Sequence, residues 1–346
     1  MKKVLATALA LAMTLSITAC GGGASSSGQP GGTSGGPSNS GTPSTASVTI
    51  QLGHGQTEAH PYHLGAAKFA ELVDTYTNGT VKVEIFPNGT LGAERDMVEG
   101  VSMGTVNACI TTNAPLTNFK SNFNVYEFPY LFTSREEAHK VLDSEIGQSL
   151  MDELESINIV GLAYFENGFR NITNNKREIA SVQDLNGLKI RTMESEIHLA
   201  AFRAMGANPT PMNWGEVYTA LAQGTIDGQE NPAMEILDGK IYEVNRYLSL
   251  TEHFYSPAEL LISADLFNSL TAEQQEGVKK AAAEACTYQR EQAGEFNQNK
   301  LDTLKENGMT IAEVDKSSFQ EATQSVYDDY QSQYGAQLDE IRAMLK

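Results

Sequence analysis

Apolar and polar positions along the first third of the folded chain change between two periods. Segments 48–52 and 81–86 alternate apolar and polar residues and are rich in β-branched side chains, which is typical of strands, and 106–110 is a third expected strand. Segments 61–76 and 93–103 instead carry apolar residues at helical spacing. The order strand, helix, strand, helix, strand predicts an α/β lobe with a parallel sheet.

The same order returns further along the chain. Segments 159–165 and 187–191 are expected strands, and 196–205 and 216–223 are expected helices. The chain of 346 residues is long enough for two domains. We therefore expect a second α/β lobe.

A long segment near the C-terminus predicts a helix that is longer than either lobe is wide. Residues 270–306 contain no proline and are rich in Ala, Glu, Gln and Lys. At 1.5 Å per residue such a helix extends roughly 50 Å. It could therefore brace both lobes.

The N-terminus has the pattern of an export signal. Lys2 and Lys3 precede an apolar run over residues 4–15 that is too short to span a bilayer comfortably, and small residues then lead to Cys20. This resembles the lipobox of bacterial lipoproteins, with a signal peptide over 1–19 and a lipidated Cys20. The alternative is a plain secretory signal with an incidental cysteine, which would leave a reactive thiol in an oxidising compartment.

Residues 20–47 then form a segment of Gly, Ser, Thr and Pro that cannot bury enough apolar surface to fold. We expect a flexible tether, with the folded part starting near Val48. The expected localisation is outside the cytoplasm, with a lipid anchor at the outer face of the cell membrane or in the periplasm.

Charge and cysteine content exclude several classes of protein. Acidic residues outnumber Lys and Arg by 43 to 24, and a formal charge of −19 disfavours binding to nucleic acid. The three cysteines are too few and too scattered for a disulfide scaffold, a four-thiolate zinc site or an iron–sulfur cluster. Whether Cys109 and Cys286 pair stays open.

Two arginines are candidates for binding an anion. Arg191 ends an expected strand, and ligands of α/β sheets gather beyond the carboxyl ends of strands. Its planar guanidinium can grip a carboxylate with two parallel hydrogen bonds. Arg170 follows another expected strand, beside Gly168. The alternative is that both are surface arginines paired with some of the many acids.

Two further segments contain candidate ligand contacts. The loop over residues 206–214 is punctuated by prolines and holds Trp214, the only tryptophan, which could equally be a core residue. Residues 227–232, Asp-Gly-Gln-Glu-Asn-Pro, are polar and could be a plain turn.

In combination, these motifs resemble one protein family. The pieces are Arg170, Lys-Ile-Arg-Thr-Met-Glu at 189–194, Gly-Ala-Asn-Pro-Thr-Pro-Met at 206–212, Asp-Gly-Gln-Glu-Asn-Pro at 227–232 and Pro-Asn-Gly-Thr-Leu-Gly-Ala-Glu-Arg at 87–95. From Val48 to the C-terminus the chain resembles the DctP-type solute-binding proteins of tripartite ATP-independent periplasmic (TRAP) transporters, family 7 of the bacterial solute-binding proteins. The resemblance implies an α/β fold with two lobes, of the class II periplasmic-binding-protein type, joined by a hinge. Lobe I would comprise 48–167 plus 258–296, and lobe II 168–257 plus 297–346.

The resemblance also implies site residues. Arg191 would form the salt bridge to the ligand carboxylate, Arg170 would be the second carboxylate contact, and Asn231 would orient the ligand and the arginine. Further expected contacts are Trp214, Glu94, Glu194, Thr112 and His54.

The function implied is that of an extracytoplasmic receptor. It would close on a small organic carboxylate and deliver it to an ion-gradient-driven membrane permease. The resemblance implies neither catalysis nor a cofactor, and we expect a monomer. Usual ligands of the family are sugar acids such as hexuronates, or C4-dicarboxylates. Thr112, Trp214 and Glu194 depart from some relatives, and the wide indole and added carboxylate favour a hydroxylated sugar ring.

Two alternatives remain at this point. His54, His60 and His63 lie within ten residues and could in principle ligate zinc in a receptor lipoprotein, although no acid-rich loop accompanies them. Glutamates such as Glu58 and Glu230 could supply a carboxylate pair for glycoside hydrolysis, but no spacing singles out a pair and no catalytic motif is present.

Overall fold

The computed structural model describes residues 47–346 of the chain. The expected signal peptide, Cys20 and nearly all of the expected tether lie outside these residues. Within the described part, no helix is both long enough and apolar enough to cross a membrane.

The N-terminal half of the described chain follows the predicted alternation closely. Helix α1 begins at Pro61, with the His60 ring accepting a hydrogen bond from the amide of Tyr62, and both α1 and β2 have the predicted bounds. Strand β3 is shifted two residues toward the C-terminus relative to the prediction. The elements are β1 (Val48–Gly53), α1 (Pro61–Tyr76), β2 (Val81–Phe86), α2 (Glu94–Ser102), β3 (Ala108–Thr112), α3 (Asn113–Leu116), η1 (Ser121–Glu127), α4 (Arg135–Leu142), α5 (Glu145–Glu153) and η2 (Leu154–Ile157).

The second half contains two strands that were expected to be irregular. The proline-punctuated loop holds a short strand at Asn208–Pro211, and the polar turn is a strand at Gly228–Asn231. Strand β4 also continues nine residues beyond its predicted end. The elements are β4 (Ile159–Asn174), η3 (Val182–Leu185), β5 (Lys189–Thr192), α6 (Glu196–Ala204), β6 (Asn208–Pro211), α7 (Trp214–Ala222), β7 (Gly228–Asn231), α8 (Ala233–Asp238), η4 (Ile241–Glu243), β8 (Tyr247–Ser263), α9 (Ala264–Ser269), α10 (Ala272–Glu306), β9 (Thr310–Glu313) and α11 (Ser317–Leu345).

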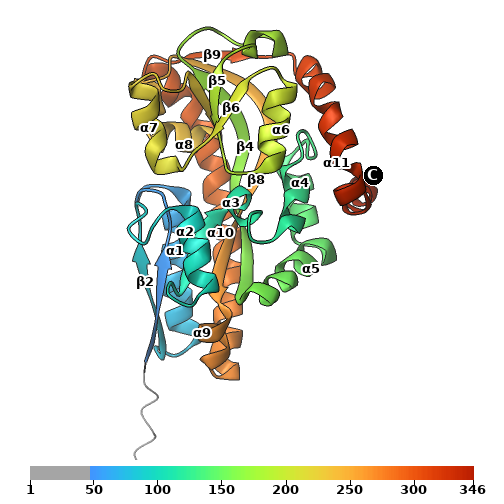
Figure 1. The fold of residues 1–346 in the computed structure, drawn as a ribbon. Coiled ribbons are helices and arrows are strands. Elements are labelled where there is room, and N and C mark those ends of the chain that lie inside the picture. The colour runs from blue at the N-terminus through green and yellow to red at the C-terminus, as the bar shows by residue number, and fades with distance from the viewer. Residues whose placement is uncertain (1–46) are drawn as a thin grey trace, which may run out of the picture. The chain divides into compact units, whose positions relative to one another are not determined.

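All nine strands of the described residues belong to one mixed sheet, not to purely parallel ones. The order is β2-β1-β3-β8-β4-β7-β5-β6, with β9 beside β8. Strands β2, β1 and β3 are parallel, as are β6, β5 and β7. The long strands β4 and β8 lie antiparallel between these two sets because they carry the chain between the lobes in opposite directions (Figure 1). The prediction of a parallel sheet is therefore right for each outer set and wrong for the centre.

Helix α10 has the predicted bracing role. Its 35 residues start at Ala272 and are capped by Thr271, whose side chain accepts a hydrogen bond from the amide of Gln274 in a capping box. The helix contacts α1 of the first lobe, α8 of the second and β4 between them (Figure 1).

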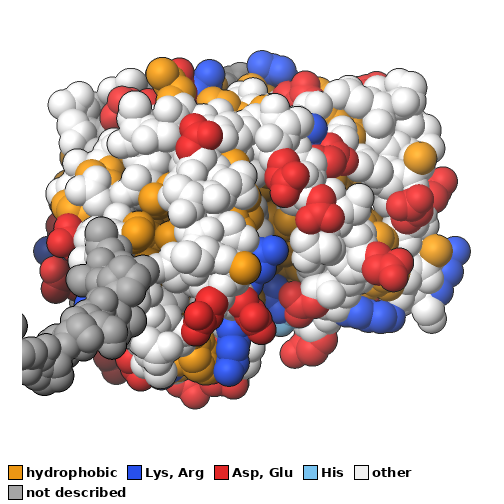
Figure 2. Space-filling model, turned by 90° about the horizontal axis from the view of Figure 1, so that it is seen from below, with side chains coloured by type: hydrophobic (Ala, Val, Ile, Leu, Met, Phe, Trp, Pro, Cys, Tyr) orange, Lys and Arg blue, Asp and Glu red, His pale blue; other side chains and the backbone are white. Residues whose placement is uncertain are grey.

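Alternating side chains of the central strands serve cores on opposite faces of the sheet. Cys109 and Leu261 pack with α2, α5, α6 and α11, whereas Ala108 and Leu260 pack with α1 and α10. Cys286 of α10 lies in the second core, so it cannot pair with Cys109, and both thiols are free and buried. Acidic side chains are spread over the face seen in Figure 2 rather than gathered in one patch.

Candidate functional site

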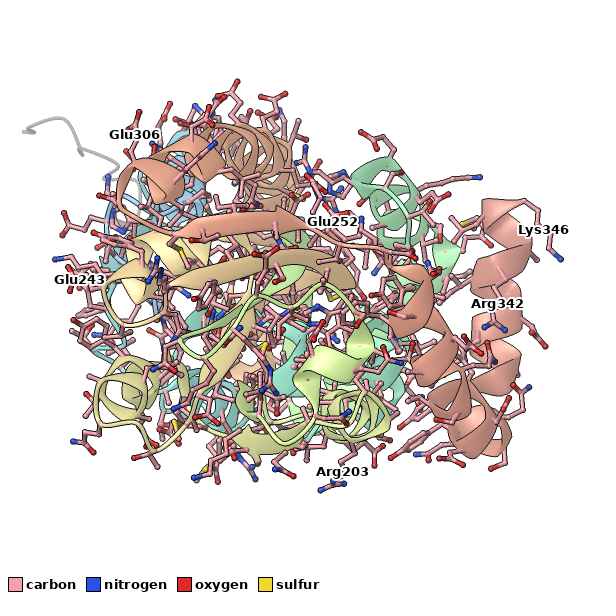
Figure 3. The ribbon with its side chains drawn as sticks, turned by 90° about the horizontal axis from the view of Figure 1, so that it is seen from above. Arg203, Glu243, Glu252, Glu306, Arg342 and Lys346 are labelled. Carbon is pink, nitrogen blue, oxygen red and sulfur yellow. The ribbon has the colours of Figure 1, made fainter. Side chains whose placement is uncertain are left out.

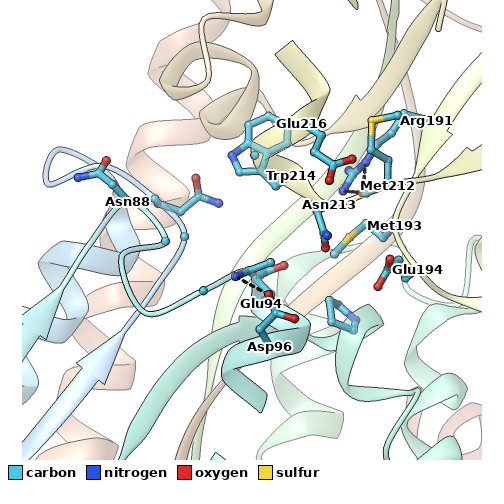
Figure 4. A pocket seen from close by; sticks show the side chains of 17 residues that line it. Asn88, Glu94, Asp96, Arg191, Met193, Glu194, Met212, Asn213, Trp214 and Glu216 are labelled. Atoms are coloured by element: carbon cyan, nitrogen blue, oxygen red, sulfur yellow. Dashed lines mark hydrogen bonds between the residues drawn. The ribbon is translucent and has the colours of Figure 1, made fainter. Parts of the chain in front are cut away.

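A cleft lies where the carboxyl ends of both sets of parallel strands meet. Its outer part has a volume of about 380 Å³ and is lined by loops and helix starts that follow β1, β2, β3, β5 and β6. This is the place where α/β sheets collect ligands. In Figure 4, Glu94 and Asp96 of α2 lie on one side, and Trp214 and Glu216 of α7 on the other.

The outer cleft continues into a narrow inner part of about 10 Å³. Arg191, Trp214 and Glu94 line both parts, so the two form one continuous site. The residues lining the inner part are Gln56, Glu94, Thr112, Asn167, Arg170, Arg191, Met193, Trp214, Asn231 and Glu235.

Arg191 is a buried guanidinium without a counter-ion among the described residues. It is 4% exposed, and its Nε and one terminal nitrogen donate to the carbonyl oxygen of Met212 at 2.8 and 2.6 Å (Figure 4). No carboxylate of residues 47–346 forms a salt bridge with it, and its other terminal nitrogen is unused within the same residues. Burial lowers the pKa of Arg191 to about 10. The group therefore has both the charge and the free donor to hold an anion.

Trp214 lies next to this guanidinium and helps to shape the site. The Arg191 carbon Cζ is 6.0 Å from the centre of the indole ring. The ring also packs on Gly239, where an added Cβ would come within 2.4 Å of the indole. The absence of a side chain at Gly239 thus leaves room for the indole, which lines the cleft on one side and packs against the core of α7 and α8 on the other.

Arg170 differs from Arg191 because its charge is already neutralised. It is fully buried, and its Nε donates to Glu230 at 2.5 Å while one terminal nitrogen donates to the same carboxylate at 2.9 Å. Burial disfavours the charged form of Glu230, but the adjacent Arg170 guanidinium holds the pKa of Glu230 well below its usual range. Another terminal nitrogen donates to Asn167 at 2.9 Å. Arg170 thus forms part of the floor of the inner cleft as an ion pair.

The first lobe contributes Glu94 and Thr112 as a connected pair. The amide and hydroxyl of Thr112 donate to the Glu94 carboxylate at 2.9 and 2.7 Å. Burial raises the pKa of Glu94 in spite of these hydrogen bonds and of the nearby arginines. The Glu94 side chain lines both parts of the cleft, as Arg191 does from the other lobe.

Of the eight predicted contact residues, six line the inner part and Glu194 lines the outer part. Asn231 is held by a hydrogen bond of 2.7 Å from its amide nitrogen to Gln229. His54 lines neither part. Its Nδ1 accepts the amide of Gln56 at 3.3 Å and its Nε2 lies 3.1 Å from His63, so the position of His54 does not support a ligand contact.

The zinc alternative is likewise not supported. His60 turns away from the other two imidazoles toward Glu235, at 3.2 Å. Within residues 47–346 no group of three His, Cys, Asp or Glu side chains is arranged to hold a metal ion. Burial, with His63 and His60 nearby, lowers the pKa of His54 to about 3, which is typical of a packed imidazole.

Four residues of the inner cleft were not predicted as contacts from the sequence: Gln56, Asn167, Met193 and Glu235. Met193 follows directly on strand β5, and Gln56 lies three residues beyond the end of β1, positions that could have identified them. Glu235 lies in the first turn of α8, three residues after the Pro that closes the polar motif, and nothing in its local sequence marks it.

Comparison with known proteins assigns the chain to a family. Residues 52–333 match the family described as "Bacterial extracellular solute-binding protein, family 7", of which DctP is the name. The chain belongs to this family. Its members are ligand-binding receptors of transport systems, and not enzymes, that work outside the cytoplasm with membrane permease subunits.

Individual family 7 relatives match over most of their length. The 2,3-diketo-L-gulonate-binding periplasmic protein YiaO of Escherichia coli K12 is 37% identical over 81% of this chain and 86% of its own. The C4-dicarboxylate-binding periplasmic protein DctP of Rhodobacter capsulatus is 32% identical over 84% and 88%. A TRAP periplasmic solute binding protein from Polaromonas sp. JS666, solved bound to D-erythronate, is 38% identical, with a TM-score of 0.84 over 86% of this chain and 98% of that one. These matches confirm the expected family, the two-lobe fold and the receptor role.

Proposed function

We propose that this family 7 protein is the receptor of a TRAP transporter that binds a small organic acid at Arg191. The observation that carries the proposal is the buried guanidinium without a counter-ion, at the point where the outer and inner cleft meet. A carboxylate placed there would gain charge-assisted hydrogen bonds and would compensate a charge that burial disfavours.

The arrangement of the lobes supports binding by hinge closure. Cleft residues come from both expected lobes, lobe I over 48–167 plus 258–296 and lobe II over 168–257 plus 297–346. Outside the inner cleft, Asn118 donates to the backbone carbonyl of Glu194 at 2.7 Å across the same boundary. Only a closed arrangement brings both sets of contacts onto one ligand, so ligand binding favours it.

The remaining parts of the proposal concern the anchor and the assembly. Lipidation of Cys20 after removal of residues 1–19 would hold the receptor at the membrane as a monomer, on the tether over 20–47. Replacing Cys20 by alanine should move the protein from the membrane fraction to the soluble one.

A thermal-shift screen tests the receptor function. The purified protein is heated with hexuronates, aldonates, C4-dicarboxylates, sialic acid and zinc, with a chelator as control for the metal. A ligand at 1,000 times its dissociation constant stabilises by about 4 kcal/mol, which corresponds to roughly 8–16 °C. We expect a shift with at least one acid and none with zinc; a panel in which only zinc shifts the melting temperature would refute the proposal.

A further inference from the structure

The carboxylate of Glu235 is only half satisfied inside the inner cleft. It is 2% exposed, and its Oε1 accepts hydrogen bonds from Asn167 and from His60. The Nδ1 of His60 accepts the amide of Tyr62, so its Nε2 carries the hydrogen that points to Glu235. Oε2 of Glu235 has no hydrogen-bond partner within residues 47–346 although it is buried. A buried carboxylate oxygen without a donor is costly, which indicates that a donor from outside the chain completes it.

The size of the inner cleft restricts what that donor can be. Its volume of about 10 Å³ is close to that of one water-sized group. A hydroxyl group of the ligand fits such a space, and a carboxylate with two oxygens does not fit without opening it.

The charges around the inner cleft also disfavour a second carboxylate of the ligand. Arg170 is compensated by Glu230, which leaves Arg191 as the one cation of the described lining residues that lacks a counter-ion. Glu94 and Glu235 line the same space as carboxylates. A first carboxylate of the ligand therefore meets a guanidinium, whereas a second one would meet carboxylates at short range, where little water screens the repulsion.

We propose, building on the receptor function above, that Glu235 determines specificity by accepting a hydrogen bond from a ligand hydroxyl at Oε2. The ligand is then a hydroxylated acid with a single carboxylate, and an acid of the same length with a carboxylate at both ends is rejected. Glu94 reinforces this selection from the opposite wall.

Matched pairs of acids test the proposal by isothermal titration of the purified protein. Each pair shares its carbon skeleton and configuration and differs in the terminal group: D-erythronate and meso-tartrate, D-gluconate and D-glucarate, D-galactonate and galactarate. Hexanoate and adipate repeat the comparison without hydroxyls. We expect the acid with one carboxylate to bind at least tenfold more tightly in the pair whose length fits, and hexanoate to bind at least tenfold more weakly than the six-carbon aldonates.

The variant Glu235→Gln separates a specificity role from a structural one. Glutamine keeps an acceptor oxygen and the side-chain shape but removes the charge, so the preference for one carboxylate over two should fall about tenfold. Glu99→Gln is the control, because Glu99 is an exposed residue of α2 that lines neither part of the cleft, and it should leave the preference within twofold.

The outcomes of the two proposals are distinguishable. If meso-tartrate, galactarate or adipate binds more tightly than its partner with one carboxylate, and this binding is lost when Arg191 is replaced, the role of Glu235 is overturned. The receptor function would still hold. An unchanged preference in Glu235→Gln would also overturn it, and if that variant does not fold, the matched pairs on the unaltered protein decide alone. No binding of any acid would instead refute the receptor function.

Discussion

Replacing Arg191 by methionine should separate ligand binding from folding. Methionine has a comparable length but no charge, and it removes the fork that faces the cleft. Two charge-assisted hydrogen bonds to a carboxylate contribute about 1.5–3 kcal/mol each, so the variant should lose about 3–6 kcal/mol of binding free energy. This corresponds to a dissociation constant raised roughly 10²- to 10⁴-fold.

The stability of the same variant should move little or in the opposite direction. The variant loses the two hydrogen bonds to Met212, but it also removes a buried charge that lacks a counter-ion among the described residues. Removing a buried charge that no salt bridge compensates removes its desolvation cost, and this offsets the lost hydrogen bonds. We therefore expect a melting temperature without ligand that is equal to or above that of the unaltered protein.

The measurement combines calorimetry with titration of the acid that gives the largest thermal shift. Arg203→Met is the matched control, because Arg203 is an exposed arginine of α6 that projects from the edge of the molecule (Figure 3). It should change neither the affinity nor the melting temperature appreciably. Affinity of Arg191→Met within fivefold of the unaltered protein would refute the assignment of the carboxylate to this guanidinium.

Three other predictions concern packing and titration. Gly239→Ala should displace the Trp214 indole, since the new Cβ would lie 2.4 Å from it, and should lower affinity by tenfold or more in the same titration without changing any charge. The pKa of His54 is about 3 in the folded state against 6.5 when unfolded, so stability should fall as pH drops below 6.5 toward 3, by up to about 1.4 kcal/mol per pH unit; His54→Gln should flatten this slope in urea titrations. Because Cys109 and Cys286 are free and buried, a thiol reagent should label them only in denaturant, and a reductant should leave the melting temperature unchanged.

The sequence predicts helices and strands best where prolines and glycines mark their ends. Helix α1 and strand β2 have their predicted bounds because Pro61 and Pro87 and the glycines after each element set the ends. Strand β7 was interpreted as a turn because Gly228–Asn231 has no large apolar side chain. Its polar side chains are buried against the cleft and against β4, and this environment is created by segments distant in the chain.

Sequence motifs predicted most of the site residues, but they did not predict which of these residues form ion pairs or hydrogen bonds with one another. Glu230 neutralises Arg170, whereas no acid of the described residues forms a salt bridge with Arg191. This difference depends on which acids the fold brings near each guanidinium. Glu235 reaches the cleft because α8 packs beside His60, from 175 positions earlier in the chain. The three histidines show the converse, since nearness in sequence did not bring their rings together around one point.

The two lobes share one hydrogen-bonded sheet, so any motion of one lobe relative to the other must deform the strands that join them. Closing the cleft requires β4 and β8 to twist and bend together, because both strands cross the boundary between the lobes without an intervening loop. Their ladder shifts register between Gly161 and Ala163, between Glu166 and Gly168, and between Arg170 and Ile172, and such irregularities are where a sheet bends most easily. The last two shifts flank Asn167 and Arg170, which line the inner cleft. We therefore expect the bending that accompanies closure to be concentrated beside the inner cleft.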